Sequence, residues 1–340
     1  MFDHPDYDDH EQVVFARDAA AGLTAIIAVH NTNLGPGLGG CRIWNYCTEA
    51  EAVADALRLS RGMTYKAALA GLALGGGKSV ILADRSEKTP AMMRAMGRAV
   101  DRLAGRYIVA EDVGATVQDI DLMAQETQHV SGRSGRSGDP SPWTAEGVYL
   151  SMQAAAQIRW GTDLNGRTVT VKGLGSVGAS LCEKLHAAGA VLKVADIRDD
   201  AVRRVCDKTG AEAVAAKAAH AQPAEVFAPC ALGAGLNPST IDDIQAEIIC
   251  GAANNQLATP SDGYLLLGRS ILYAPDYLVN AGGVISVARE PLGLTESDAQ
   301  AKVKEIPETL RRVLKMAAQQ GICPGQAADR LAESKFKTAA

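Results

Sequence analysis

Two lysines, Lys66 and Lys78, lie twelve residues apart in an otherwise apolar and glycine-rich run, residues 62–81 (GMTYKAALAGLALGGGKSVI). Lysine is rarely buried unless another group pairs with it. A partly desolvated lysine beside a second cation has a lowered pKa and can act as a base. A lysine that keeps its charge can hold a carboxylate instead. The segment therefore offers both an anion holder and a proton acceptor.

A carboxylate that could serve these lysines is Asp112, which lies just beyond a strand predicted over 106–110. Ligand-binding groups of open α/β sheets commonly lie beyond the ends of strands. A carboxylate near two lysines could pass a proton, and each lysine would lower the pKa of the other. The three residues together predict proton-transfer chemistry at one site.

Each of the three residues also has a simpler interpretation on its own. Lys66 has the pattern of a surface lysine whose stem lies along a helix. Lys78 could belong to a phosphate-binding turn, since Gly77-Lys78-Ser79 matches the end of the P-loop pattern, but Leu72 occupies the place of that pattern's first glycine. Asp112 could cap a helix or a turn. The pattern alone leaves these alternatives open.

A glycine-rich turn between a strand and a helix predicts dinucleotide binding. The sequence GLGSVG at 173–178 follows a β-branched strand at 168–172 and opens a helix over 177–188. Its first glycine permits a tight turn, its second lets a pyrophosphate approach the backbone, and its third lets helix and strand pack closely. The free N–H groups and dipole of the helix hold the phosphates. A glycine turn without a ligand is the alternative.

Asp196 favours NAD as the dinucleotide. It stands at the end of a strand predicted over 191–195, 23 residues after Gly173, where a carboxylate accepts hydrogen bonds from the ribose hydroxyls. Its charge would repel the 2′-phosphate of NADP. Arg198, two residues further on, keeps NADP open as the alternative.

The composition is that of a globular protein of about two domains. The chain has 340 residues, of which 47% are hydrophobic and 21% charged. A formal charge of -5 without any basic block argues against a nucleic-acid or membrane surface. No apolar run approaches the ~20 residues that span a bilayer. The acidic N-terminus lacks the regions of a signal peptide, so we expect a cytoplasmic protein.

The cysteines and histidines predict neither disulfides nor a metal site. The seven cysteines are dispersed and contain no CxxC pair, which is typical of reduced thiols. The six histidines are equally scattered. His4 and His10 lie among aspartates, but a frayed terminus is a poor metal site.

Glycines and helix-capping residues predict the helices and strands around the lysines. Two strands within 13–29 join at Ala21-Gly22, and the glycines of 34–40 indicate a loop. Thr48 and Glu51 form a capping-box pattern that begins a helix. A buried strand is then expected from Val80.

Further along the chain, a helix is predicted from Pro90 to about Leu103, and Thr116 caps the next one. Residues 132–142 (GRSGRSGDPSP) contain no large apolar side chain and indicate a mobile loop or an interdomain linker. Helix signal resumes at Thr144 and lasts to about Trp160.

Several blocks of the sequence resemble the amino-acid dehydrogenase family of leucine, valine, phenylalanine and tryptophan dehydrogenases, which is related to glutamate dehydrogenase. The resemblance covers nearly the whole chain, and its blocks are residues 34–44, 62–81, 110–114, 141–148, 173–178, 229–237, 250–257 and 273–287.

The resemblance implies a two-domain α/β fold. An N-terminal α/β domain, 1–140, binds the substrate and makes the oligomer contacts; a Rossmann domain, 141–320, binds NAD; and a C-terminal helix, 321–340, could pack back on the first domain. The active site lies in the cleft between the domains. The implied reaction is the NAD-dependent, reversible oxidative deamination of an L-amino acid to its 2-oxo acid and ammonium by a homo-oligomer.

The resemblance also assigns roles to residues. Lys66 resembles the lysine that holds the substrate carboxylate, Lys78 the catalytic lysine that activates water, and Asp112 the aspartate that exchanges protons with it. The other implied substrate-binding residues are Gly39, Gly40, Met63, Leu38, Ala110, Asn254, Val284 and Val287. The implied cofactor-binding residues are Gly173, Gly175, Ser176, Val177, Gly178, Asp196, Ile197, Thr144, Cys230, Ala231 and Asn255.

The implied side-chain pocket predicts an apolar substrate. None of Leu38, Ala110, Val284 and Val287 is positively charged, which disfavours glutamate. Branched aliphatic amino acids are the first choice, and aromatic ones are the alternative. Trp143 and Glu146 depart from the family pattern and could alter a pocket edge or a domain contact.

Two other classes of protein could share the cofactor fold. A 2-hydroxy acid dehydrogenase needs a histidine beside a carboxylate or an arginine, and His129 is the only candidate in the first domain. A non-catalytic protein could use NAD as a signal, although the lysines and Asp112 argue against an inactive site.

Overall fold

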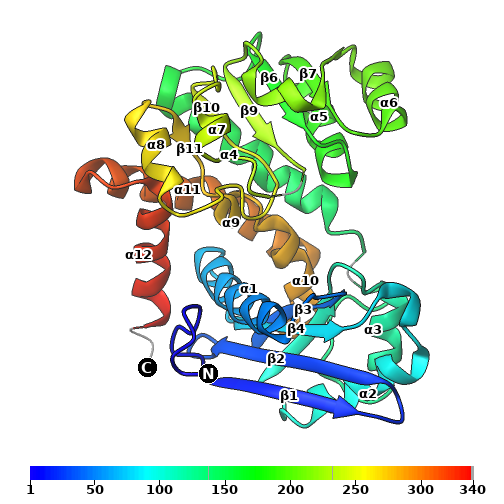
Figure 1. The fold of residues 1–340 in the computed structure, drawn as a ribbon. Helices are drawn as coiled ribbons and strands as arrows, with labels where there is room; N and C mark the ends of the chain where they lie inside the picture. Colours follow the sequence, from blue (N-terminus) through cyan, green and yellow to red (C-terminus); the bar gives the residue numbers. More distant parts are fainter. Residues whose placement is uncertain (137, 232, 338–340) are drawn as a thin grey trace. The chain divides into compact units, whose positions relative to one another are not determined.

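The computed structural model describes residues 1–136, 138–231 and 233–337, and the chain forms two compact units (Figure 1). Unit 1 comprises residues 1–138, 284–299 and 332–340, and unit 2 comprises 139–283 and 300–331. The chain therefore returns twice to unit 1. The domain ranges 1–140, 141–320 and 321–340 stay a prediction, because a compact unit need not be an independently folding domain.

Unit 1 is built on a five-stranded mixed sheet with the order β1-β2-β4-β3-β5. Strand β2 runs antiparallel to β1 and β4, whereas β3 runs parallel to β4 and β5. The strands are β1 (Gln12–Asp18), β2 (Leu23–Asn31), β3 (Gly37–Trp44), β4 (Gly75–Leu82) and β5 (Tyr107–Glu111).

Helices cover both faces of this sheet, so its strands alternate between two apolar cores (Figure 1). Ala25 and Ile27 of β2 pack against helices α2 (Pro90–Asp101) and α3 (Val117–Met123). Ile26, between them, packs against α1 (Glu49–Leu69) on the opposite face. Successive side chains of a strand point to opposite faces, which explains why β2 is apolar almost throughout.

Helices α1, α2 and α3 each begin after a threonine. The side chains of Thr48, Thr89 and Thr116 each accept a backbone N–H in the first turn of α1, α2 and α3. The capping box expected at Thr48 is only half formed, because the Glu51 carboxylate accepts the N–H of Cys47 instead.

Two glycine-rich segments are strands, and the expectation of a loop over 34–40 and of a strand that begins only at Val80 was wrong. Strand β3 begins at Gly37 and β4 begins at Gly75. A Cβ on Gly39 would lie 1.6 Å from the carbonyl oxygen of Gly77, and a Cβ on Gly76 would lie 2.2 Å from the backbone nitrogen of Thr64. These glycines let β3, β4 and α1 approach closely instead of marking a turn.

Unit 2 contains a six-stranded, wholly parallel sheet with the order β11-β10-β9-β6-β7-β8. The chain leaves the central strand β6 toward β7 on one side and reaches β9 on the other, which is the doubly wound topology of a Rossmann fold. The strands are β6 (Thr168–Lys172), β7 (Val191–Ala195), β8 (Glu212–Ala213), β9 (Val226–Pro229), β10 (Ile248–Ile249) and β11 (Leu272–Tyr273).

Parallel strands need crossover connections, and helices supply them in unit 2. The connecting helices are α5 (Ser176–Ala187), α6 (Asp199–Thr209), α7 (Pro238–Ile241) and α8 (Asp262–Gly268), while α4 (Ser141–Trp160) precedes β6 and α9 (Asp276–Val279) follows β11. Helix α4 begins at Ser141, three residues before the predicted start at Thr144. Among the described residues, no helix combines the length and the apolar character needed to cross a membrane.

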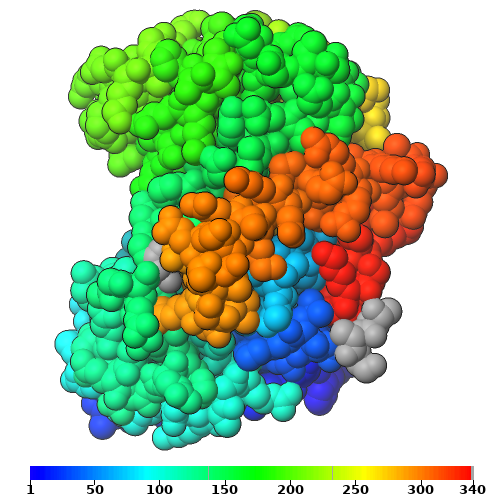
Figure 2. Space-filling model, turned by 180° about the vertical axis from the view of Figure 1, so that it is seen from behind, coloured from blue at the N-terminus to red at the C-terminus, as the bar shows by residue number. Residues whose placement is uncertain are grey.

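Three helices take the chain between the units: α10 (Gly282–Leu292), α11 (Glu296–Gln320) and α12 (Pro324–Phe336). Within unit 1, Ser131 Oγ donates to the carbonyl oxygen of Val287 at 2.8 Å, and Arg133 Nε lies 2.5 Å from Glu290 Oε1. Figure 2 shows the orange stretch of the chain, which includes α10, on one face of the molecule. The expected loop over 132–142 is thus anchored at its start, while residue 137 lies outside the described residues.

The end of α12 packs on α1. Phe336 contacts Tyr65 edge to face, with ring centroids 5.3 Å apart, and Lys335 Nζ donates to the carbonyl oxygen of Ala68 at 2.8 Å. Phe336 also packs on His30, a buried histidine of β2 whose Nδ1 lies 2.8 Å from Thr64 Oγ1. Burial, and then the nearby His10, lowers the pKa of His30 to about 4.

The buried His30 should make the stability of unit 1 depend on pH. Unfolded His30 binds a proton below about pH 6.5, whereas folded His30 stays neutral down to about pH 4. The unfolding free energy should therefore fall as pH drops from about 6.5 to 4, by up to ~3 kcal/mol from this residue. Urea unfolding of the wild type and His30→Gln over this range would measure it.

A control is Ile43→Val, which removes one methyl group from the other core of unit 1 without touching His30 or an ionisable group. It should lower stability by a similar amount at each pH. An unchanged pH slope in His30→Gln would contradict the assignment.

Candidate active site

The buried lysine of β4 forms the centre of the candidate site. Lys78 lies in the middle of the strand with its side chain only 7% exposed, and its Nζ donates to Asp112 Oδ2 at 2.5 Å. Burial lowers the pKa of Lys78 by more than the Asp112 carboxylate raises it. A lysine in this state loses its proton more easily than one in water, as a base requires.

Asp112 follows β5 and is held by two cations. Its Oδ2 accepts from Lys78 Nζ and also from Arg42 Nε at 3.1 Å. Burial alone would raise the pKa of Asp112, but Lys78 and Arg42 outweigh it and hold the pKa below its usual value. The carboxylate therefore stays ionised between the two cations.

Strand register explains why these side chains meet. Arg42 pairs with Val80 in the sheet, and Val80 packs in the core beneath α1. Lys78, two residues before Val80, points to the same face, and Cys41 and Ile43 point to the other. The charged groups of β3 and β4 thus lie on the α1 face of the sheet.

Sequence reasoning missed Arg42, together with its partners Asp55 and Tyr46. Arg42 Nη1 donates to Asp55 Oδ2 at 2.8 Å, and the Tyr46 hydroxyl donates to the same oxygen at 2.7 Å. The available signal was an arginine between the apolar residues Cys41 and Ile43, in a strand too buried for an unpaired charge.

Lys66 lies in the last turn of α1 and is half-buried, and Met63 lies one turn earlier on the same helix. The close approach of Gly76 to the backbone of Thr64 brings this turn of α1 onto the start of β4. Lys66 and Lys78 therefore come from two elements that pack against each other. The role of Lys66 in holding a carboxylate stays a prediction.

Among the other predicted substrate residues, Gly40 of β3 lies against Asp112. Gly40 pairs with Ala110, and a Cβ on Gly40 would lie 2.6 Å from the Asp112 Cβ. Leu38 and Ala110 are buried, whereas Gly39 underlies the close contact of β3 with β4. Val284 and Val287 lie half-buried on α10.

The dinucleotide turn of unit 2 has the geometry that its sequence predicts. Gly173 has a φ of +102°, and a Cβ on Gly178 would lie 1.9 Å from the Gly173 carbonyl oxygen. Gly175 and Ser176 are exposed, Val177 is half-buried, and the first turn of α5 has no capping side chain at Gly175. The N–H groups of this turn remain available to an anion.

Asp196 lies beyond β7 and next to this turn. Its Oδ2 accepts the N–H of Leu174 at 2.6 Å, and its Oδ1 accepts the N–H of Arg198 at 2.9 Å. Burial opposes ionisation of Asp196, but these hydrogen bonds and Arg198 lower its pKa. The carboxylate is thereby fixed in its charged form. Ile197 beside it is 91% exposed.

Two further loops of unit 2 carry the remaining predicted residues. Cys230 and Ala231 follow β9, and a Cβ on Gly173 would lie 2.6 Å from the Ala231 nitrogen. Asn254 Oδ1 accepts from Asn280 Nδ2 at 2.8 Å. Asn255 has a φ of +51°, and the adjoining Gln256 is buried and donates to the Gly251 carbonyl at 2.8 Å. The loop that carries both asparagines is therefore internally braced.

The start of α4 contains Thr144 and the two departures from the family pattern. Thr144 Oγ1 donates to the carbonyl oxygen of Pro140 at 3.1 Å. Gly282 packs so closely on the Trp143 backbone that a Cβ would lie 1.9 Å from its carbonyl oxygen. Glu146 pairs with Lys184 of α5 at 2.6 Å, so this residue ties two helices of unit 2 together.

Comparisons with known proteins identify the family. Residues 10–129 match the family described as Glu/Leu/Phe/Val dehydrogenase, dimerisation domain, and residues 190–339 match that described as Glutamate/Leucine/Phenylalanine/Valine dehydrogenase. The chain belongs to this family. The predicted family resemblance, the two-domain α/β class and the assignment as an amino-acid dehydrogenase are confirmed, and the family uses a nicotinamide cofactor.

Individual relatives cover the chain almost completely. It is 49% identical to leucine dehydrogenase of Bacillus cereus over 99% of this chain and 93% of that protein, and 48% identical to valine dehydrogenase of Streptomyces coelicolor over 99% and 94%. It is also 43% identical to L-tryptophan dehydrogenase from Nostoc punctiforme, whose crystal structure matches with a TM-score of 0.87 over 97% of both chains. Glutamate dehydrogenase of Thermus thermophilus, at 22% identity, shares the fold with a TM-score of 0.78.

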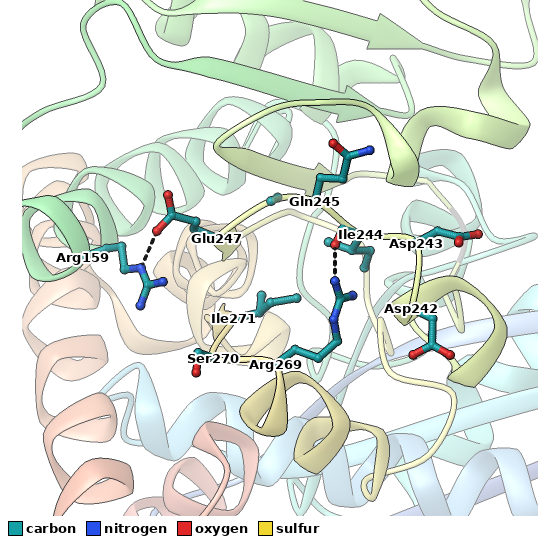
Figure 3. Close-up of a pocket in the computed structure, with 10 residues that line it drawn as sticks. Arg159, Asp242, Asp243, Ile244, Gln245, Glu247, Arg269, Ser270 and Ile271 are labelled. Atoms are coloured by element: carbon teal, nitrogen blue, oxygen red, sulfur yellow. Dashed lines mark hydrogen bonds and ion pairs between the residues drawn. The ribbon is translucent and has the colours of Figure 1, made fainter.

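A separate pocket lies in unit 2 at the amino-terminal ends of strands β10 and β11 (Figure 3). Glu247 and Ile271, in its lining, precede β10 and β11, whereas ligands of such sheets bind beyond the carboxyl ends of the strands. Its arginines are already engaged: Arg159 Nε donates to Glu247 at 2.7 Å, and Arg269 donates to the carbonyl oxygens of two residues, including Ile244 at 2.8 Å. None of the predicted site residues lines it.

Proposed function

We propose that the protein catalyses the NAD-dependent, reversible oxidative deamination of an apolar L-amino acid, with a branched aliphatic side chain favoured. The observation that carries this proposal is the buried Lys78 with a lowered pKa, 2.5 Å from an ionised Asp112. The high identity to leucine and valine dehydrogenases supports the substrate class.

The residues of unit 1 bind the amino acid and move its protons. Lys66 holds the α-carboxylate as a point charge, and Met63 on the same helix borders the substrate. The nicotinamide, when bound, supplies the hydride acceptor. Neutral Lys78 then takes a proton from the water that attacks the imine carbon of the substrate, and Asp112 exchanges that proton with it. Ammonia leaves as that proton is passed to its nitrogen, and the new hydroxyl gives its own proton to Lys78 as the C–N bond breaks and the carbonyl of the 2-oxo acid forms.

The residues of unit 2 hold the cofactor. The exposed turn at Gly175 and Ser176 fits a pyrophosphate, and Asp196 fits the hydroxyls of a ribose. Because its carboxylate is fixed in the charged form, Asp196 would repel a 2′-phosphate, which favours NAD over NADP. Thr144 and Asn255 are proposed to border the nicotinamide, and Asn254 to contact the substrate.

The side chain of the substrate is proposed to contact apolar residues of unit 1. Leu38, Ala110, Val284 and Val287 present no charge that could pair with a second carboxylate, which disfavours glutamate. An aromatic amino acid is the alternative substrate, and the similarity to a tryptophan dehydrogenase supports this alternative. The match of residues 10–129 to a dimerisation domain supports a homo-oligomer as the working form.

The substrate class predicts the outcome of an NADH-oxidation panel. With ammonium present, the 2-oxo acids of leucine and valine should give the highest kcat/KM, and 2-oxoglutarate should be a poor substrate because no cation balances its second carboxylate. Absorbance at 340 nm measures the rate. Turnover that does not depend on ammonium would contradict the deamination proposal, and a preference for phenylpyruvate or indolepyruvate would establish the aromatic alternative.

Replacement of the proposed base should stop the chemistry without removing the cofactor. Lys78→Ala should lower kcat by ~10²–10⁴-fold, the usual contribution of a general base. NADH binding, measured by fluorescence titration, should persist because the cofactor residues belong to unit 2. Lys208→Ala is the matched control, since Lys208 lies on α6 and pairs with Glu183 at the surface. Full activity in Lys78→Ala would refute the role.

The charge of Asp196 should decide between the two cofactors. Asp196→Asn keeps an oxygen for the Leu174 N–H but loses the negative charge, so the preference for NADH over NADPH should fall by ~10- to 100-fold, as expected for a charged hydrogen bond of 1.5–3 kcal/mol. The ratio of kcat/KM values measures it. Asp200→Asn, which alters an exposed acid paired with Arg204, should leave the ratio unchanged. An unaltered ratio in Asp196→Asn would contradict the proposal.

A further inference from the structure

A line of alternating charges runs through unit 1 and ends at the proposed base. Asp55 accepts from Arg42 Nη1 at 2.8 Å, Arg42 Nε donates to Asp112 at 3.1 Å, and Asp112 accepts from Lys78 Nζ at 2.5 Å. Tyr46 completes it, since its hydroxyl donates to the same oxygen of Asp55. Arg42 thus bridges two carboxylates with two different nitrogens of one rigid, planar group.

We propose that Arg42, held in place by Asp55, is a positioning residue that fixes Asp112 for proton exchange with Lys78 and sets the pH range in which the pair works. This inference rests on the proposed roles of Lys78 and Asp112.

The geometry restricts Asp112 from two sides. Both cations bind its Oδ2, so the carboxylate cannot rotate without losing contacts to Lys78 and Arg42 together. Arg42 and Asp112 each have 24% of their side chains exposed and Asp55 31%, so solvent screens these charges only in part. A lysine at the place of Arg42 could not form both contacts with the same geometry.

Arg42 also acts on the protonation of the pair. Its charge stabilises the Asp112 carboxylate and opposes a proton on Lys78. Asp55 is the counter-charge that limits this effect. Burial, reinforced by Asp55, raises the pKa of the Tyr46 hydroxyl, so Tyr46 remains a donor to Asp55.

The other ionisable groups around Lys78 do not replace Arg42. From β3, Cys41 is a neutral thiol because burial raises its pKa to about 12. From β5, burial raises the pKa of Tyr107 well above its usual value, and its hydroxyl donates to the Gly39 carbonyl. Strand β2 places Ala28 opposite Lys78, and α1, which packs on β4, contributes Asp55 through its contact with Arg42 and carries Lys66 in its last turn.

Three variants separate charge from structure. Arg42→Met removes the positive charge. Asp55→Asn removes the negative charge while keeping an acceptor for Arg42 and Tyr46. Arg42→Lys keeps the positive charge but lacks the planar guanidinium that contacts both carboxylates. The acid limb of the kcat/KM profile for oxidative deamination would report loss of the Lys78 proton. It should move up by about one pH unit in Arg42→Met, down by a smaller amount in Asp55→Asn, and little in Arg42→Lys.

In Arg42→Lys, kcat should nevertheless fall by about tenfold, because Asp112 loses its fixed orientation. Limbs that stay in place in both charge variants, or that move in the same direction, would overturn the proposal and leave Arg42 with a merely structural role. Thermal melting identifies any variant that does not fold. If Arg42→Met fails to fold, the direction in which the acid limb moves in Asp55→Asn, compared with Arg42→Lys, decides the test.

A second measurement needs no turnover. Competitive labelling with acetic anhydride, followed by peptide mass spectrometry, gives the midpoint of Lys78 deprotonation in the holoenzyme and in each variant. If the wild type shows no dehydrogenase activity but these midpoints shift in opposite directions, the proposed function fails and the role of Arg42 stands. If turnover is normal and the midpoints coincide, the role of Arg42 fails alone.

Discussion

The burial of one lysine constrains the whole of unit 1. Transferring an ammonium group from water into a sheet costs several kcal/mol unless a partner and good geometry compensate. Lys78 has that partner in Asp112, and Asp112 in turn depends on Arg42. The attraction between buried charges offsets the cost of desolvation only at short distance and with good geometry. Strands β3 and β4 and the residues after β5 must therefore hold their register within narrow limits. The glycines of β3 and β4 help to fix this register.

Close backbone packing supplies the rigidity that large side chains supply elsewhere. Aromatic residues make up only 4% of the chain. Gly39 and Gly76 instead bring β3, β4 and α1 into contact at distances that leave no room for a Cβ. The same approach places the last turn of α1, with Lys66, across the strand that carries Lys78. The glycines of this sheet therefore help to fix the buried charge in place.

How well the sequence predicted a feature depends on the range of the interactions that form it. The turn at 173–178, strands β6 and β7 and Asp196 lie within 29 consecutive residues, and their local pattern predicted the observed elements. Gly75–Gly77 were expected outside the strand, because glycine usually marks a turn and only contacts with distant segments explain it inside one. Arg42 was missed because its partner Asp112 is 70 residues away.

Lys66, Lys78 and Asp112 were singled out by residue type and position, and their separate roles were assigned by resemblance and stay a prediction. A lysine that must be a base and an aspartate that must remain ionised place opposite demands on one pair, since each group favours the charged form of the other. A third charge can meet both demands, because a cation beside the carboxylate lowers the pKa of both groups. Arg42 is that cation, and Asp55 keeps the line of charges balanced. In the proposed function the substrate side chain contacts none of these charged groups but apolar residues of β3, β5 and α10, so chemistry and specificity would be free to vary independently in this fold.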